Sequence, residues 1–321
     1  MAHSPQFSWH LESLIAHVGV GSDPAYGSVS TPIYQTVTFQ HPGEALGPFD
    51  YSRTENPTRK SLAQALARIE NGAGAVLFSS GMAAIASLLH LLHAGDHIIV
   101  TEDSYGGTYR IIVDIFEKLG IQASFVDTRD LEKTAAAFTD HTRFVFIETP
   151  SNPILRITDI ARLSTLCHTH HALLIVDNTF MTPVAQKPLD LGADVVVYSA
   201  TKYLSGHNDV LAGAVITQSA DLAEQIGAIA NATGGILAPW DSWLVLRGLK
   251  TLALRMKQHQ ASAQKVAEFL KAHPAVKTIY YPGLTDHIGH TLQTQQASGF
   301  GGMLSFELLR TDMVIPFMNA L

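Results

Sequence analysis

Residues 199–207 of the 321-residue chain hold a lysine between hydroxyl side chains and a glycine, in the order Ser-Ala-Thr-Lys-Tyr-Leu-Ser-Gly-His. They follow an apolar, β-branched run at 194–198 that predicts a buried parallel strand. Ligands of open α/β sheets bind beyond the carboxyl ends of the strands, so we expect Lys202 to face a ligand. A partly desolvated lysine there can form a Schiff base with an aldehyde, while Ser199 and Thr201 could direct hydroxyls at a phosphate. The alternative is a surface lysine in an ordinary turn.

Two other segments have residue types that suit a phosphate. Tyr51 and Arg53 alternate in an irregular stretch, so in extended backbone they point the same way and could form a phosphate clamp. A surface arginine on a loop is the alternative. At 79–82, Ser-Ser-Gly-Met joins a predicted strand to a helix, whose first N–H groups can bind an anion. Serines there are also good helix caps.

Polar side chains follow three more predicted strands. Tyr105 lies in the segment 103–107, Asn152 in 148–153 and Asp177 in 177–179. Because the carboxyl ends of parallel strands meet at one edge of a sheet, we expect these residues at the same edge as Lys202. Each also has a plain structural interpretation, as a turn cap or a rim residue.

Strand and helix patterns alternate through most of the chain. This alternation predicts an α/β fold with a mostly parallel sheet sandwiched by helices. The expected strands are 75–78, 97–101, 121–126, 143–147, 173–176, 194–198 and 211–217. The expected helices are 59–70, 81–93, 107–118, 131–137, 157–168 and 221–232.

The remaining segments set the expected domains. Residues 1–60 are rich in turn formers and predict an arm that contacts a neighbouring subunit; 61–250 would form the large domain. Residues 251–321 would hold a long linking helix, whose pattern starts at 244, and the start of a small α+β domain with strands at 276–282 and 301–308. A helical pattern over 313–321 ends with the chain, so we expect this small domain to be incomplete.

Composition excludes several classes of partner. The net charge is −7 with no basic block, which argues against nucleic acid and anionic membranes, and no apolar run approaches the ~20 residues of a membrane helix. Cys167 is alone and no secretory signal is visible, so we expect a soluble, cytoplasmic protein. His168, His170 and His171 suggest zinc only weakly, because no cysteine or acidic partner stands at ligand spacing, and we expect no metal.

With these residues in view, the chain resembles the cystathionine-type, pyridoxal-phosphate-dependent enzymes of Cys and Met metabolism. The resemblance runs through nearly the whole chain in matching order and spacing. It rests on the motifs at 51–58, 79–83, 105–110, 148–153, 177–179 and 199–203.

The resemblance implies a type I aspartate-aminotransferase-like fold and a role for each motif residue. Lys202 would carry pyridoxal 5'-phosphate as a Schiff base and later move protons, Asp177 would pair with the ring nitrogen, Tyr105 would stack on the ring and Asn152 would lie near its hydroxyl. The phosphate would be held by Gly81, Met82, Ser199 and Thr201, and by Tyr51 and Arg53 of a neighbouring subunit. It also implies homotetramers, built as dimers of dimers, that act on small amino-acid substrates.

Within the family, the segments 49–51 and 237–243 look most like bacterial cystathionine γ-synthases and homoserine-ester sulfhydrylases. We therefore expect cystathionine formation from an O-acyl-homoserine and cysteine, with cystathionine γ-lyase or β-lyase as alternatives. Glycine in the 105–108 motif, where methionine γ-lyases usually have cysteine, disfavours that activity. Family members continue past the equivalent of Leu321 with a carboxylate-binding arginine, so a cofactor-binding but inactive protein is a further alternative. An aminotransferase of this fold is disfavoured by the motifs at 105–108 and 199–202.

Overall fold

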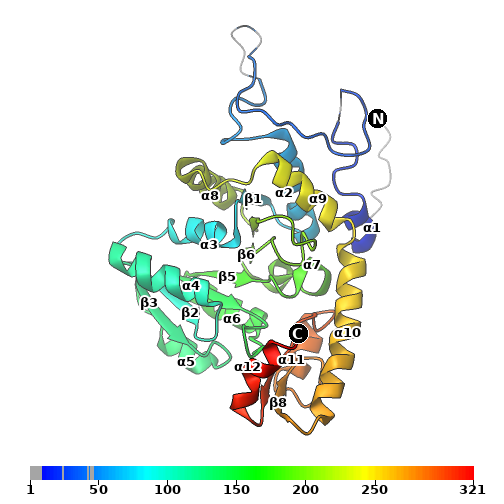
Figure 1. The fold of residues 1–321 in the computed structure, drawn as a ribbon. Coiled ribbons are helices and arrows are strands. Elements are labelled where there is room, and N and C mark those ends of the chain that lie inside the picture. The colour runs from blue at the N-terminus through cyan, green and yellow to red at the C-terminus, as the bar shows by residue number, and fades with distance from the viewer. Residues whose placement is uncertain (1–8, 24, 42, 44–46) are drawn as a thin grey trace. The chain divides into compact units, whose positions relative to one another are not determined.

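The structure is a computed structural model that describes residues 9–23, 25–41, 43 and 47–321 (Figure 1). The chain forms two compact units, each built from two separate stretches. The first unit takes the described residues among 1–84 together with 199–254, and the second takes 85–198 and 255–321. The expected domains 1–60, 61–250 and 251–321 follow other boundaries, and that division stays a prediction.

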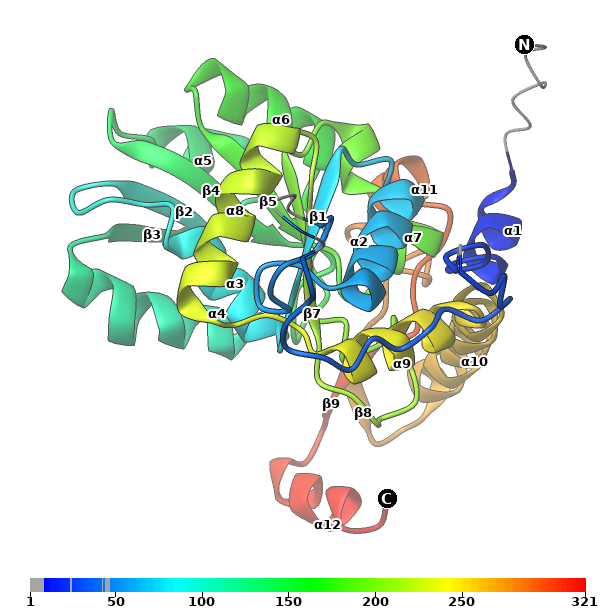
Figure 2. The same cartoon turned by 90° about the horizontal axis from the view of Figure 1, so that it is seen from above.

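The first unit is built around the antiparallel pair of β1 and β7, with helices packed on β1 (Figure 2). Its elements are α1 (Leu11–Ala16), α2 (Pro57–Glu70), β1 (Gly74–Phe78), β7 (Gly213–Thr217), α8 (Ala220–Thr233) and α9 (Pro239–Leu249). Helix α3 (Gly81–Leu89) begins at the end of its first stretch. Alternation of strands and helices does not fix strand direction, so the sequence could not indicate this antiparallel pair.

Helix α2 illustrates how the local sequence sets the element. Asn56 caps it by accepting the N–H of Thr58, Pro57 occupies its first position, and Asn71 ends it in the left-handed region with φ 60°. Leu62 and Leu66 are among the residues that it buries, and the helix packs against β1 and α9. The sequence placed its start two residues later, at 59.

The second unit contains a parallel sheet with the strand order β6-β5-β4-β2-β3. These strands are β2 (His97–Thr101), β3 (Gln122–Val126), β4 (Thr142–Glu148), β5 (Leu173–Asp177) and β6 (Val195–Tyr198). They alternate with α4 (Gly106–Ile111), η1 (Ile112–Phe116), η2 (Glu117–Leu119), α5 (Leu131–Ala136), α6 (Ile160–Thr169), α7 (Thr182–Ala185) and η3 (Pro188–Leu191). The predicted parallel strands are therefore confirmed to within a residue or two at each end.

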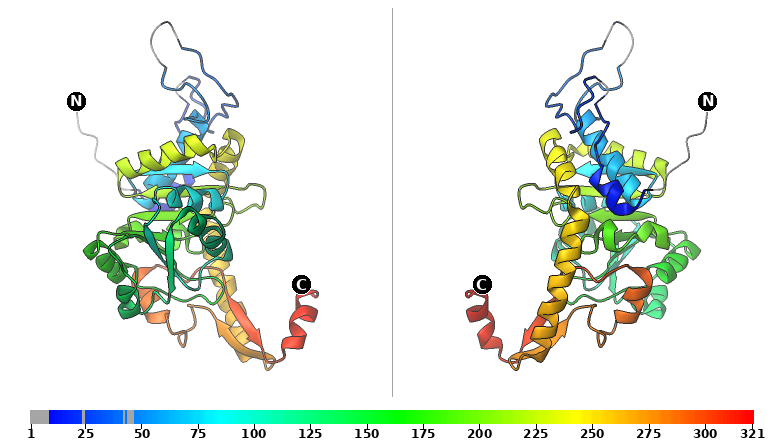
Figure 3. Two further views of the ribbon diagram at one scale, coloured as in Figure 1. Left: turned by 90° about the vertical axis from the view of Figure 1, so that its left-hand side faces the viewer. Right: turned by 90° about the vertical axis from the view of Figure 1, so that its right-hand side faces the viewer.

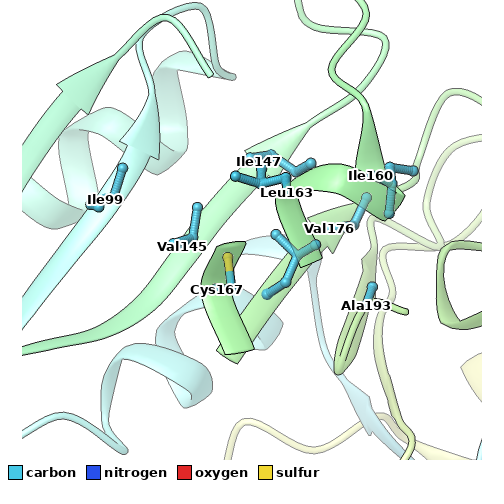
Figure 4. Close-up of a cluster of buried hydrophobic side chains, with 9 residues drawn as sticks. Ile99, Val145, Ile147, Ile160, Leu163, Cys167, Val176 and Ala193 are labelled. Atoms are coloured by element: carbon cyan, nitrogen blue, oxygen red, sulfur yellow. The ribbon is translucent and has the colours of Figure 1, made fainter. Parts of the chain in front are cut away.

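One hydrophobic cluster joins this sheet to α6 (Figure 4). Ile99, Val145 and Ile147 from the strands meet Leu163 and Cys167 of the helix, all of them fully buried. Burial raises the pKa of the Cys167 thiol to about 12, so this cysteine packs as a small apolar residue, as the sequence predicted.

The remaining elements of the second unit follow the long helix α10 (Leu252–Ala272), which runs to the antiparallel pair of β8 (Val276–Tyr280) and β9 (Ser305–Leu308) (Figure 3). Ala263 and Ala267 of α10 pack with the buried Tyr281. The last elements are α11 (His290–Gln296), η4 (Thr311–Met313) and α12 (Val314–Met318).

The helical pattern that begins at 244 was expected to form one continuous helix, and this prediction was wrong. Helix α9 ends at Leu249, and α10 begins only at Leu252. A Cβ added at Gly248 would lie 2.2 Å from the carbonyl oxygen of Ser205, so α9 contacts backbone directly at this point. The direction of α9 is therefore set by a tertiary contact that helical periodicity does not report.

Two of the three histidines considered for zinc have other partners. His168 Nε2 lies 3.0 Å from a carboxylate oxygen of Asp194, and His170 stacks on Phe138 with ring centroids 4.2 Å apart. In the described part of the chain, no group of three or more His, Cys, Asp or Glu side chains could hold a metal. Nor does any described helix have the length and apolar character needed to cross a membrane.

Candidate functional site

In the first unit, Lys202 lies in a turn that directly follows β6. The N–H of Lys202 donates to Ser199 O at 3.1 Å, and its carbonyl accepts the N–H of Gly206 at 2.8 Å. The side chain of Lys202 is exposed, so the partly desolvated amine that the sequence suggested is not observed. Within the described residues its Nζ has no hydrogen bond or ion pair, which leaves the amine free to react or to move.

The hydroxyl of Thr201 has a different environment from the one expected. Its Oγ1 donates to Ala212 O at 3.1 Å and accepts the N–H of Ala212 at 3.0 Å. A hydroxyl has a single proton, so Thr201 can donate to a phosphate only by giving up its bond to Ala212 O. These two bonds fix the Lys202 turn to the chain just before β7.

Gly81 and Ser199 lie together, although they are far apart in the sequence. A Cβ at Gly81 would be 2.9 Å from Ser199 Cβ and 3.1 Å from its Oγ. Gly213 has a similar role, because a Cβ there would be 2.1 Å from Ser80 O. At both positions another segment of the chain lies against the glycine, and any larger residue would have to displace that segment.

The start of α3 supplies the unpaired N–H groups that the sequence suggested. Ser80 caps the helix, since its Oγ accepts the N–H of Ala83 at 3.1 Å and its carbonyl accepts that of Ala84 at 3.1 Å. The N–H groups of Gly81 and Met82 have no acceptor among the residues that the structure describes. With the hydroxyl of Ser199 beside Gly81, these donors form a cradle for an anion.

Tyr51 and Arg53 contact each other, with the Arg53 guanidinium carbon 5.4 Å from the centroid of the Tyr51 ring, although residues 52–54 form a turn and not the extended backbone that the sequence suggested. The segment is also held by residues of its own chain. Arg53 Nη1 donates to the carbonyl of Asn231 near the end of α8, and Thr54 Oγ1 donates to Asn231 Oδ1 at 3.3 Å. Arg53 is nevertheless exposed, and a guanidinium has donors to spare beyond this one bond.

In the second unit, Asp177 is the last residue of β5 and is only 8% exposed. Its Oδ1 accepts the N–H of Thr179 at 3.0 Å. Burial raises the pKa of Asp177, while hydrogen bonds from Thr179 oppose this rise. Within the described residues no lysine, arginine or histidine pairs with Asp177, so this carboxylate suits a cationic ligand.

Tyr105 and Asn152 lie on loops at the carboxyl ends of strands of the same unit. Tyr105 is 45% exposed and directly precedes α4, whereas Asn152 is half-buried. The N–H of Tyr105 donates to Glu148 Oε2 at 2.7 Å. Glu148 lies opposite Asp177 in the register of β4 and β5. The sequence analysis gave Glu148 no role, although two acidic residues at the ends of neighbouring strands could have indicated one.

Residues 12–321 match the family described as Cys/Met metabolism PLP-dependent enzyme. The chain belongs to this family. It has the α/β type I fold of pyridoxal-phosphate-dependent enzymes, and pyridoxal phosphate is its cofactor.

Relatives with different activities are about equally similar to the chain. It is 47% identical over 312 residues to a cystathionine gamma-lyase of Bacillus subtilis, covering 97% of this chain and 82% of the relative. It is 49% identical over 314 residues to a cystathionine beta-lyase of Lactococcus lactis subsp. cremoris, with the same two shares. The crystal structure of a cystathionine gamma synthase from Xanthomonas oryzae pv. oryzae, in complex with aminoacrylate and cysteine, matches with a TM-score of 0.94 and 41% identity, over 96% of this chain and 80% of that one. The chain is therefore a trans-sulfuration enzyme whose particular reaction the similarities do not select.

The observed residues suit the cofactor of this family. The cradle of Gly81, Met82 and Ser199 offers N–H and O–H groups for a phosphate. Asp177, buried and without a cation among the described residues, suits a protonated ring nitrogen, whose positive charge would lower the pKa that burial raises.

Proposed function

We propose that the chain is a cystathionine γ-synthase, which joins an O-acyl-homoserine to cysteine. The bond from Cγ to the ester oxygen breaks, a bond from Cγ to the cysteine sulfur forms, and a carboxylic acid leaves. The observation that carries the proposal is the exposed amine of Lys202, unpaired within the described residues. Chemistry at Cγ needs a base that serves successive carbon atoms, and an unpaired lysine on a flexible stem can do so.

The other site residues have proposed roles in holding the cofactor. When bound, pyridoxal phosphate supplies an electron sink for the negative charge that develops at the substrate Cα. Asp177 would hold the proton on the ring nitrogen, Tyr105 would stack on the ring and Asn152 would bind its hydroxyl. Gly81, Met82, Ser199 and Thr201 would hold the phosphate, Thr201 after exchange of its bond to Ala212. Lys202 would remove the proton from Cα and then one from Cβ, which releases the group on Cγ.

We also propose that the active site is shared between subunits of a homotetramer built as a dimer of dimers. Tyr51 and Arg53 would bind the phosphate held by a neighbouring chain. The exposure of Arg53 and its contact with the Tyr51 ring support this role. A cytoplasmic location also stays a proposal, based on the single, buried Cys167.

The lyase activities are the second candidate, favoured by the 47% and 49% identities to a cystathionine γ-lyase and a β-lyase. Both consume cystathionine and water. The γ-lyase reaction yields cysteine, 2-oxobutyrate and ammonia, whereas the β-lyase reaction yields homocysteine, pyruvate and ammonia.

Product analysis separates these functions. The purified protein is loaded with pyridoxal phosphate and incubated with O-acetyl- or O-succinyl-homoserine plus cysteine, and separately with cystathionine alone. Formation of cystathionine supports the synthase. Release of 2-oxobutyrate or pyruvate from cystathionine, without synthesis, would replace it by a lyase. A bound cofactor without turnover would favour the inactive protein.

Lys202→Ala tests the assignment of the lysine itself. We expect this variant to lose the absorbance of the lysine-bound cofactor and all turnover, because no other group in the motif can attack the aldehyde. Lys250→Ala, which replaces an exposed lysine outside the site, is the control. Full activity of Lys202→Ala would contradict the whole site assignment.

A further inference from the structure

The loop that carries Tyr105 is bound at its base to the segment after β4. Arg156 Nη1 donates to Glu102 Oε1 at 2.6 Å, and Ser151 Oγ donates to Asp103. Glu102 is an exposed residue, so its ion pair contributes little to holding the loop.

A third bond of this loop is different because its acceptor is buried. Glu148 is 6% exposed, and its Oε2 accepts the N–H of Tyr105 at 2.7 Å. The carbonyl of Tyr105 accepts the N–H of Thr108 at 2.9 Å, in the first turn of α4. Both backbone polar groups of Tyr105 are thus held, although its side chain is 45% exposed.

We propose that Glu148 is a positioning residue, which fixes the direction of the Tyr105 ring by holding the backbone N–H of that residue. The inference rests on the proposed function in one respect, the contact of this ring with the cofactor. An aromatic ring stacks well only in a narrow range of orientations, so a loosened backbone at Tyr105 weakens cofactor binding.

The charge state of Glu148 is part of this role. Its carboxyl is faced by two other acids, Asp177 on the neighbouring strand and Asp103 on the Tyr105 loop. Burial, and then the negative charge of Asp177, raise the pKa of Glu148 well above its ordinary value. A neutral carboxyl still accepts the N–H of Tyr105 through its carbonyl oxygen. Glutamine has the same shape and the same acceptor without the charge.

Three variants test the proposal in the full chain. Glu148→Met removes the acceptor at similar side-chain volume, Glu148→Gln keeps it, and Glu102→Gln makes the same chemical change at an exposed carboxylate of the loop. The measurements are the dissociation constant of pyridoxal phosphate, the circular dichroism of the bound cofactor, and the amide hydrogen exchange of Tyr105 in the apoprotein.

We expect Glu148→Met to bind pyridoxal phosphate about tenfold more weakly, the usual effect of losing one hydrogen bond, and to change the cofactor dichroism. Glu148→Gln and Glu102→Gln should stay within about twofold of the unaltered protein. In a Tyr105→Ala background the effect of Glu148→Met should disappear, because the two residues act as one unit. Affinity unchanged in Glu148→Met, or equally reduced in Glu148→Gln, would overturn the proposal.

The exchange measurement keeps the test decisive if Glu148→Met fails to fold. In the unaltered apoprotein we expect the Tyr105 amide to exchange slowly and that of Gly106, which has no acceptor among the described residues, to exchange fast. Equal, fast exchange would overturn the inference. If the unaltered protein does not bind pyridoxal phosphate, the proposed function fails, and slow exchange at Tyr105 would still support the hydrogen bond itself.

Discussion

Asp177 and Glu148 end neighbouring strands. In the proposed function, the negative charge of Asp177 holds the proton on the ring nitrogen of the cofactor. Asp177→Asn keeps the shape and the bond from Thr179 but removes this charge. We expect the cofactor to bind while turnover falls on the order of a hundredfold, the loss typical when one electrostatic stabiliser of a developing charge is removed. Steady-state kinetics and cofactor absorbance measure the two effects separately. If Asp177 only capped a turn, asparagine would serve as well and activity would survive.

Glu148 should make the stability of the apoprotein depend on pH. Its pKa in the folded state lies well above its ordinary value of 4.5, because burial and Asp177 disfavour the charged form. As pH rises above 4.5, the unfolded chain releases this proton and the folded chain keeps it, so the free energy of unfolding falls. Glutamine does not titrate, so the unaltered protein should lose stability relative to Glu148→Gln as the pH rises.

Urea unfolding of both proteins between about pH 5 and pH 8 tests this difference. Glu102→Gln is the control, since it makes the same chemical change at an exposed carboxylate. A constant difference between the unaltered protein and Glu148→Gln would mean that the carboxyl of Glu148 is ionised in the folded state.

At the scale of elements, Asn56 joins the N-terminal segment to α2. Its Oδ1 accepts the N–H of Thr58 at 3.0 Å, and its Nδ2 donates to Tyr34 O at 2.9 Å and Ser52 Oγ at 3.0 Å. We expect Asn56→Ala to lower the free energy of unfolding by about 2 kcal/mol, because a helix cap is lost and the partly buried carbonyl of Tyr34 loses its partner.

Ser219→Ala provides the matched control, since Ser219 caps α8 through the exposed N–H of Leu222 and holds no other segment. We expect Ser219→Ala to lower the free energy of unfolding by about 1 kcal/mol or less. Equal costs of the two substitutions in urea unfolding would show that Asn56 acts only as a cap.

The elements that the sequence predicted well are those whose signal is local. The β-branched runs of β2 and β6 fix buried strands by composition, and Asn56 and Pro57 mark a helix start. Contacts at a distance left no such signal. The break after α9 depends on Gly248 meeting Ser205, and the antiparallel pairing of β1 with β7 depends on partners from separate stretches.

The site residues also divide into those with a local signal in the sequence and those without one. Lys202, Ser199 and Gly81 could be predicted as site residues because their types and spacing suit a Schiff base and a bound phosphate. The bonds of Thr201 to Ala212 and of Glu148 to Tyr105 could not be predicted, because they depend on which backbone groups the fold brings near each side chain.

At the scale of the whole molecule, subunit sharing of the site is open to a complementation test. Arg53→Ala and Lys202→Ala chains should each be inactive alone, but a hybrid dimer would contain one intact site. Random pairing of equal amounts would therefore restore about a quarter of the activity.

The two chains must be co-expressed or exchanged, and each variant must first be shown to fold and assemble. Because Arg53 also bonds to Asn231 of its own chain, Thr54→Ala, which removes the neighbouring bond to Asn231, controls for a purely local effect. If well-formed hybrids recover no turnover, each chain builds its own site, and the N-terminal segment has only a structural role.

The division of the first unit into two stretches has a consequence for synthesis on the ribosome. Strand β1 is apolar, and its partner β7 is made only after residues 85–198 have emerged. At ordinary rates of translation β1 waits on the order of ten seconds with an unpaired edge. Such edges invite pairing with other chains, so nascent chains that stop before Gly213 should need chaperones to stay in solution. The unit whose synthesis starts first therefore cannot fold until residues 85–198 of the other unit have been made.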